Sequence, residues 1–224
     1  MPRNRLSFAL GLAIALVTAP ALAQSHQDID KVNGSITAEA GQTYGDLDTV
    51  NGSIRLEMGA TVGDAETVNG SIQAAESVTA KSLTTVNGSV RVGTSSKLDS
   101  VETVNGSIFV DRGGNIHRGV ETVNGAIGLV DTDLGGGIET VNGDITVGVG
   151  SHVRGGIHVE KPGHNWGFSM GKKKPPRIVI GPNAQVDGAM VFEREVVLYV
   201  HRTAKVGSIT GAKAIPFDTD RAPE

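Results

Sequence analysis

A single tripeptide, Val-Asn-Gly, recurs seven times at an almost constant interval, and this repeat constrains the fold more than any other feature of the sequence. The intervals are 18, 18, 18, 18, 19 and 18 residues, and the valines are Val32, Val50, Val68, Val86, Val104, Val123 and Val141. Four residues after each valine comes an isoleucine or a valine. A fixed period of this length is typical of proteins in which each repeat stacks on its neighbours.

The 18-residue unit divides further into sixes. Steps of six from Val50 meet an apolar side chain at every position to Ile116. After one inserted residue the frame resumes at Val123 and runs to Val159, with only Gly135 lacking a side chain. A period of six in β-branched residues indicates short strands separated by sharp corners. We therefore predict an all-β fold, a single-chain parallel β-solenoid (β-helix) with about 18 residues and three short strands per turn.

Stacked turns place equivalent residues in columns. The asparagines should form a ladder of side-chain amides, each bonded to the ones above and below. Each is followed by a glycine, which we expect at a corner with positive φ. The ladder residues are Asn33, Asn51, Asn69, Asn87, Asn105, Asn124 and Asn142.

A second predicted column is acidic and is interrupted only by Thr84. Like charges at strand spacing repel, so we expect these side chains to splay outward into solvent. The alternative is a calcium-binding column, because carboxylate oxygens suit that ion. The acidic residues are Asp30, Asp48, Glu66, Glu102, Glu121 and Glu139.

The first 23 residues have the pattern of a signal peptide. Arg3 and Arg5 precede the apolar run Leu6–Val17, and the small residues of Ala21–Ala23 follow it. The run is 12 residues, and a transmembrane helix needs about 20. The chain has no cysteine, which excludes disulfides and a lipid anchor on cysteine. We predict an exported chain, periplasmic, secreted or on the cell surface, with no transmembrane segment after cleavage and no lipoprotein anchor.

Charge and composition change at residue 161. Residues 24–160, the predicted solenoid repeats, hold 8 basic and 18 acidic residues, whereas residues 161–224 hold 10 and 6. The aperiodic segment 161–177 carries five basic residues, no acidic residue and the only tryptophan. We predict final solenoid turns over 178–212 and a tail over 213–224.

A structureless loop of this length is commonly functional. Two interpretations stay open: a solvated insertion without a partner, or an exposed basic-aromatic loop that binds anionic cell-envelope components, with nucleic acid an unexpected partner because of export. The candidate binding residues are Lys161, Trp166, Phe168, Lys172, Lys173, Lys174 and Arg177.

Two families share these motifs. The sequence Glu-Thr-Val-Asn-Gly-x-Ile, at 102–108 and 139–145, resembles the bacterial adhesin β-helix domains. Ile-Gly-Pro-Asn-Ala-Gln-Val-Asp-Gly at 180–188 and Val-Gly-Ser-Ile at 206–209 resemble the bactofilins, which form polymers. The resemblance implies a right-handed coil, although the period of six alone suits either hand.

The strong signals are all repeated, whereas a catalytic site requires a unique set of residues. We therefore predict a non-catalytic protein with a structural, adhesin-like or envelope-binding role and without a cofactor or metal. One alternative is a self-assembling, bactofilin-like scaffold, because the acidic shaft and the basic end are complementary. The other is a β-helix enzyme acting on envelope polysaccharide or an acyl donor. Its candidate residues are His152, His158, His164 and His201, with Asp187 or Glu195.

Overall fold

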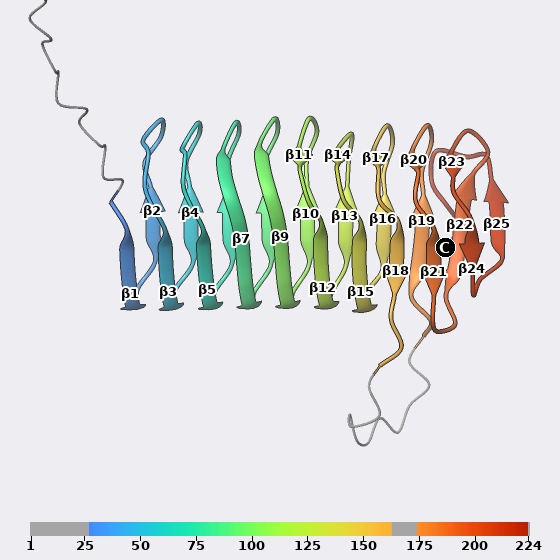
Figure 1. Cartoon of the computed structure of the whole chain (residues 1–224), viewed down its shortest axis with the longest axis horizontal. Coiled ribbons are helices and arrows are strands. Elements are labelled where there is room, and N and C mark those ends of the chain that lie inside the picture. Colours follow the sequence, from blue (N-terminus) through green and yellow to red (C-terminus); the bar gives the residue numbers. More distant parts are fainter. Residues whose placement is uncertain (1–26, 163–173, 224) are drawn as a thin grey trace, which may run out of the picture.

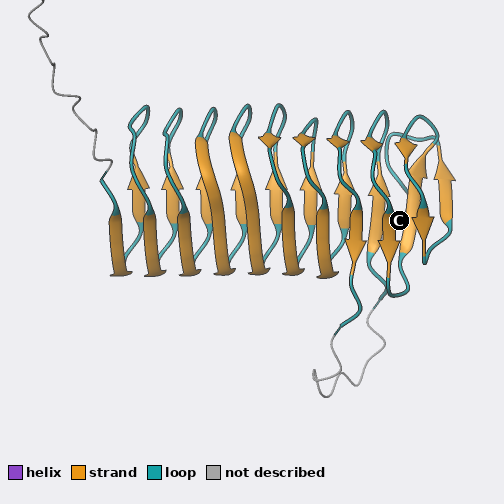
Figure 2. Cartoon of the chain, in the orientation of Figure 1, coloured by secondary structure: helices purple, strands orange, loops and turns teal. Residues whose placement is uncertain are grey.

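A computed structural model of the chain describes residues 27–162 and 174–223. These residues form a parallel β-solenoid in which successive turns stack along one axis (Figure 1). The fold class predicted from the repeat is confirmed: all regular structure in the described residues is β-strand (Figure 2). Within those residues no helix is long and apolar enough to cross a membrane.

The strands form two sheets, and all their pairings are parallel. The 15-stranded sheet covers two faces of the solenoid, because two of its strands, β7 (Thr79–Asn87) and β9 (Lys97–Asn105), are long enough to continue around the corner between them. The first of these faces contains β1 (Ile29–Asn33), β3 (Leu47–Asn51), β5 (Ala65–Asn69), β7 (Thr79–Asn87), β9 (Lys97–Asn105), β12 (Val120–Asn124), β15 (Ile138–Asn142), β18 (Ile157–Val159), β21 (Met190–Phe192) and β24 (Ile209–Thr210).

The second face continues from the first halves of β7 and β9. Its remaining strands are β11 (Asn115–Ile116), β14 (Asp133–Leu134), β17 (His152–Val153), β20 (Gln185–Val186) and β23 (Lys205–Val206). The third face is a separate 10-stranded sheet. It consists of β2 (Ile36–Ala38), β4 (Ile54–Leu56), β6 (Ile72–Ala74), β8 (Val90–Val92), β10 (Ile108–Val110), β13 (Ile127–Leu129), β16 (Ile145–Val147), β19 (Arg177–Ile180), β22 (Val197–His201) and β25 (Ala214–Phe217).

The strand register follows the sequence period. Leu47 pairs with Ala65, one repeat away, and Val101 pairs with Val120, which places the extra residue where the sequence frame slips. Strand β19 pairs with β16, so the stacking of the third face continues after residues 163–173. Strand β25 pairs with β22, so pairing continues to Phe217, inside the segment expected as a tail.

The interior is a narrow apolar column, with six inward positions per turn. In one complete turn these are Leu47, Thr49, Ile54, Leu56, Ala60 and Val62, each no more than 4% exposed. The six-residue frame predicted from the sequence differs from these inward residues at one position per turn. Val50 faces outward and is 41% exposed, while the preceding Thr49 faces inward. In a later turn the inward residue is Leu134 in place of Gly135, because the preceding corner is one residue shorter.

Most inward threonines are compatible with this dry interior because their hydroxyl groups are hydrogen-bonded. Five of them donate to the carbonyl oxygen of a glycine in the preceding turn, over 2.8–3.1 Å. The pairs are Thr49 to Gly34, Thr67 to Gly52, Thr85 to Gly70, Thr103 to Gly88 and Thr122 to Gly106. Thr140 is an exception, because its Oγ1 has no hydrogen-bond partner among the described residues.

The glycines after the asparagines have a different role from the expected one. Of the seven, only Gly34 and Gly125 have positive φ. The others are required by close stacking: a Cβ at Gly70 would overlap the carbonyl oxygen of Gly52 in the preceding turn. Positive φ occurs instead mainly at the corner between the third and second faces, at Gly41, Gly59, Ser77, Ser95, Gly113, Asp131, Gly150 and Asn183.

Candidate functional site

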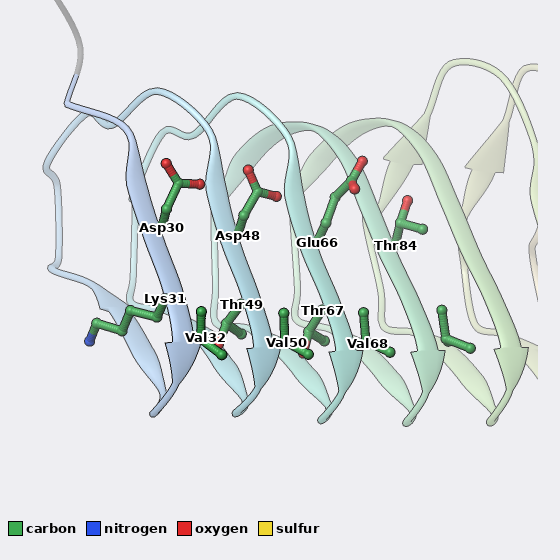
Figure 3. Close-up of a pocket in the computed structure, with 11 residues that line it drawn as sticks. Asp30, Lys31, Val32, Asp48, Thr49, Val50, Glu66, Thr67, Val68 and Thr84 are labelled. Carbon is green, nitrogen blue, oxygen red and sulfur yellow. The ribbon is translucent and has the colours of Figure 1, made fainter.

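The outer side of the first face carries the same residue types on successive turns. Strand side chains alternate in direction, so Ala65 and Thr67 are buried while Glu66 and Val68 point out. The acidic column and the Val-Asn-Gly valines therefore run side by side along the solenoid. Figure 3 shows Asp30, Asp48, Glu66 and Thr84 in one row with the valines in a parallel row below.

The valine column is an exposed apolar stripe. Val32, Val50, Val68, Val86 and Val104 are each between 37% and 68% exposed. Shallow grooves run over both columns: one of about 460 Å³ from Asp30 to Val86, and one of about 260 Å³ from Thr84 to Glu160. A flat face with repeated apolar and charged groups is suited to contacts that recur at the spacing of the turns.

Side-chain ladders fix the edge of this face. Each asparagine amide after Asn33 donates to the side-chain oxygen of the asparagine in the preceding turn, and these six bonds measure 3.0–3.2 Å. The ladder ends at Arg194, whose Nη1 donates to the side-chain oxygen of Asn142 at 2.5 Å and to the carbonyl of Val141 at 3.0 Å.

Negative charge accumulates on the acidic column. Partial burial, followed by the neighbouring Glu66, Asp30 and Asp46, raises the pKa of Asp48. Burial also raises the pKa of Glu121, with further contributions from Glu139, Glu102 and Glu160. In both residues burial is the larger cause, and repulsion between the stacked carboxylates adds to it.

The acidic column ends at Glu139 on β15, and the next strand of this face, β18, has a histidine at the equivalent position. His158 takes the register position of the acidic residue, directly beside Glu139, and Glu160 follows on the same side of the chain. Ligand atoms of these three residues all lie within 4.8 Å of one another. His158 has a further partner: its Nε2 lies 3.1 Å from a carboxylate oxygen of Glu193.

The histidines considered for catalysis fall into separate environments. His152 Nε2 lies 2.7 Å from Asp187, and hydrogen bonds from Gln185 and His152 lower the pKa of that carboxyl group. His201 is bonded through Nδ1 to the hydroxyl group of Thr203 and packs edge-on against Phe217. His164 lies outside the described residues, and Glu195 lies in the turn before β22.

The candidate binding loop is described only at its ends. Lys161 and Lys174 are exposed, whereas Trp166, Phe168, Lys172 and Lys173 lie outside the described residues. Arg177 begins β19 and is engaged within the fold.

The Arg177 guanidinium donates to the carbonyl oxygens of Ala222 and Pro223 at 3.1 and 2.9 Å and lies over the ring of Tyr199. Its role in the described structure is to hold the C-terminal segment against the third face.

Sequence reasoning missed Glu160, Glu193 and Arg194. Glu160 could have been found from the sequence, because it lies two residues after His158, the residue at the next position of the acidic column. The other two follow the insertion, where the simple period no longer assigns a turn.

The comparisons with known proteins give no family assignment: no family model, no curated protein and no solved structure matches the chain. The β-solenoid is compatible with the bactofilin-like repeats that the sequence resembles, and no match supports the adhesin family.

Proposed function

We propose that this chain is an exported, non-catalytic β-solenoid with a structural, adhesin-like role. In this proposal the basic C-terminal end attaches to anionic envelope material, and the acidic shaft projects away from it. The observation that carries the proposal is the separation of charge along the solenoid axis. Because each turn adds one step along that axis, the change of charge at residue 161 becomes a change of charge along the rod.

The acidic part is the longer one. Its column occupies turns from β1 to β15, each about 4.8 Å from the next, so it extends over roughly 30 Å. Exposed basic residues lie on the insertion and the last turns: Lys161, Lys174, Arg202, Lys205, Lys213 and Arg221.

Salt limits the influence of one end on the other. At physiological ionic strength electrostatic interactions between exposed charges are screened over about 8 Å. The basic end can therefore attract an anionic surface while most of the acidic shaft lies beyond the screening distance. The shaft itself is repelled by anionic material, which favours an upright orientation.

Vesicle binding tests this proposal. The mature chain should co-sediment with vesicles of phosphatidylcholine and phosphatidylglycerol, should not bind phosphatidylcholine alone, and should be released by 0.5 M NaCl. The triple variant K172A/K173A/K174A should lose most of this binding. The matched control K31A/K81A/K97A removes three lysines from the acidic part and should bind like the unmodified chain. Equal loss in both variants, or binding to neutral vesicles, would contradict the proposal, as would turnover of an envelope glycan by the pure protein.

A second candidate function is self-assembly, and the strand edges at the two ends favour it. Among the described residues β1 pairs only with β3 and β2 only with β4, while β24 pairs only with β21 and β25 only with β22. Open parallel edges can add the end of a second copy. Sedimentation velocity should then show a concentration-dependent series of oligomers at low salt, and monomers at every concentration would exclude this function.

A further inference from the structure

The turn between β15 and β18 has a cluster of side chains that the proposed function does not use. Glu139 and His158 are direct register partners on adjacent strands, and Glu160 follows His158 by two residues. Glu160 directly follows the end of β18 and lines the same outer groove as Glu139, so all three residues lie on the outer side of one face. No earlier turn of the column has a histidine at this position.

The three ligand atoms are close enough for a single ion. They lie within 4.8 Å of one another, and the two glutamates are exposed, so small side-chain rotations can shorten these separations. Metal–ligand bonds to imidazole nitrogen and carboxylate oxygen are about 2.0–2.2 Å, which puts the ligand atoms of a tetrahedral ion roughly 3.3–3.6 Å apart. The strand pairing fixes the backbone positions, so only side-chain torsions need to change.

A second observation, from a different turn, concerns the histidine. One oxygen of the Glu193 carboxylate lies 3.1 Å from Nε2 of His158, and the other accepts the backbone N–H of Lys161 at 3.3 Å. Metal-bound histidines almost always have a carboxylate or carbonyl on their second ring nitrogen, which fixes the tautomer and the ring orientation. With the proton on Nε2, Nδ1 of His158 has the free lone pair that a metal ion requires.

The electrostatic surroundings also favour a cation. None of the ion pairs within residues 27–162 and 174–223 includes Glu121, Glu139 or Glu160. Glu121 is the register partner of Glu139 on the preceding turn, so carboxylates stack at strand spacing in this part of the column. A divalent ion would relieve that repulsion.

We propose that Glu139, His158 and Glu160 form a binding site for a divalent transition-metal ion such as Zn²⁺, with Glu193 as a positioning residue for His158. The nitrogen donor distinguishes this site from the all-oxygen calcium column considered from the sequence, because calcium takes oxygen ligands. Three protein ligands leave at least one position of a tetrahedral ion for water or for a group from a partner.

Calorimetric titration of the full mature chain with ZnCl₂ tests the site. One ion should bind per chain, and CaCl₂ should bind far more weakly. His158→Ala and Glu139→Gln should each reduce the affinity at least tenfold while circular dichroism shows an unchanged fold. The matched controls are His152→Ala, which removes another carboxylate-paired histidine, and Glu66→Gln, which removes a carboxylate from an earlier turn of the column. Both controls should bind Zn²⁺ like the unmodified chain.

The positioning role of Glu193 has its own measurement. Glu193→Gln should keep a stoichiometry of one ion but lower the affinity by about 10- to 100-fold, and the absorption spectrum of bound Co²⁺ should shift. Glu193→Asp should restore part of the affinity. The proposal is overturned if no ion binds at one per chain, if His158→Ala binds as tightly as the unmodified chain, or if calcium binds as well as zinc. An unchanged Co²⁺ spectrum in Glu193→Gln overturns the positioning role alone.

Discussion

The guanidinium of Arg194 donates a hydrogen bond to the side-chain oxygen of Asn142, 52 residues earlier in the chain. Asn142 is the last member of the asparagine ladder, so its side-chain oxygen would otherwise have no donor from a following turn. The insertion occupies the place in the chain where the next asparagine would come. A residue beyond the insertion therefore completes a ladder that begins at Asn33 and ties the final turns to the repeats.

Replacing Arg194 by alanine should destabilise the fold by about 1–2 kcal/mol, because charge-assisted hydrogen bonds contribute more than neutral ones. Denaturant unfolding followed by circular dichroism measures the change. Arg202→Ala is the matched control, since Arg202 makes only a 3.8 Å exposed pair with Asp218. Equal stability of the two variants would contradict a stabilising role of Arg194 at the end of the asparagine ladder.

Gly88→Ala should destabilise the solenoid by several kcal/mol, since the added Cβ would overlap the backbone of Gly70 in the turn below and backbone atoms cannot move aside cheaply. Gly41→Ala is the control that measures the cost of backbone strain without the steric overlap. Gly41 has a φ of 67° and nothing within 4 Å of the added Cβ, so its substitution should cost only about 1 kcal/mol. Thermal unfolding of both variants compares the two costs, and an equal loss at the two positions would contradict the close-stacking explanation.

Substitution by valine should affect the free energy of unfolding differently at two inward threonines. Thr103 donates to the carbonyl oxygen of Gly88, so Thr103→Val should cost about 1 kcal/mol. Thr140 is 2% exposed, and its Oγ1 has no hydrogen-bond partner among the described residues. Thr140→Val should therefore be neutral or stabilising by about 1 kcal/mol. Urea unfolding at neutral pH measures both, and a loss of stability in Thr140→Val comparable to that in Thr103→Val would refute the assignment.

The acidic column should make stability depend on pH. Burial and neighbouring carboxylates raise the pKa of Asp48 above 3.8, so its ionised form is disfavoured in the folded state. This penalty is fully present above the folded pKa and is relieved as the pH falls towards 3.8. Asp48→Asn should raise the free energy of unfolding by about 0.5 kcal/mol at pH 7.5 and change it little at pH 3.5.

Glu57→Gln, outside the column, is the control for loss of one negative charge. Urea unfolding at the two pH values supplies the comparison. A stabilisation by Asp48→Asn that is the same at both pH values would argue against carboxylate repulsion.

The period of the sequence was sufficient to predict the solenoid and its columns, but it did not determine which of two adjacent residues faces inward. Thr49 and Val50 are both β-branched, so strand preference does not separate them, and hydrophobicity favours the wrong one. The alternation along the strand separates them, because Asp48 and Val50 project outward while Leu47 and Thr49 project inward. Once the turns have stacked, the inward hydroxyl group of Thr49 bonds to the carbonyl oxygen of Gly34.

The candidate metal site was beyond sequence reasoning for a related reason. His158 continues the acidic column, but its partner Glu193 lies beyond an insertion of irregular length, and only the pairing of β18 with β21 shows that the two residues are neighbours. The charge change at residue 161, by contrast, is readable from composition, because a solenoid preserves the order of its sequence along its axis.

The most direct test of the account removes one complete turn. Deleting residues 68–85, which make up one 18-residue repeat, should leave every later strand on its own face. The shortened chain should keep its β-type circular dichroism and unfold cooperatively at a temperature close to that of the full chain. Deleting only residues 68–76 should abolish cooperative unfolding, because each later strand would meet the wrong face of its neighbour. If both deletions leave the fold intact, or both destroy it, stacking in an 18-residue register is wrong.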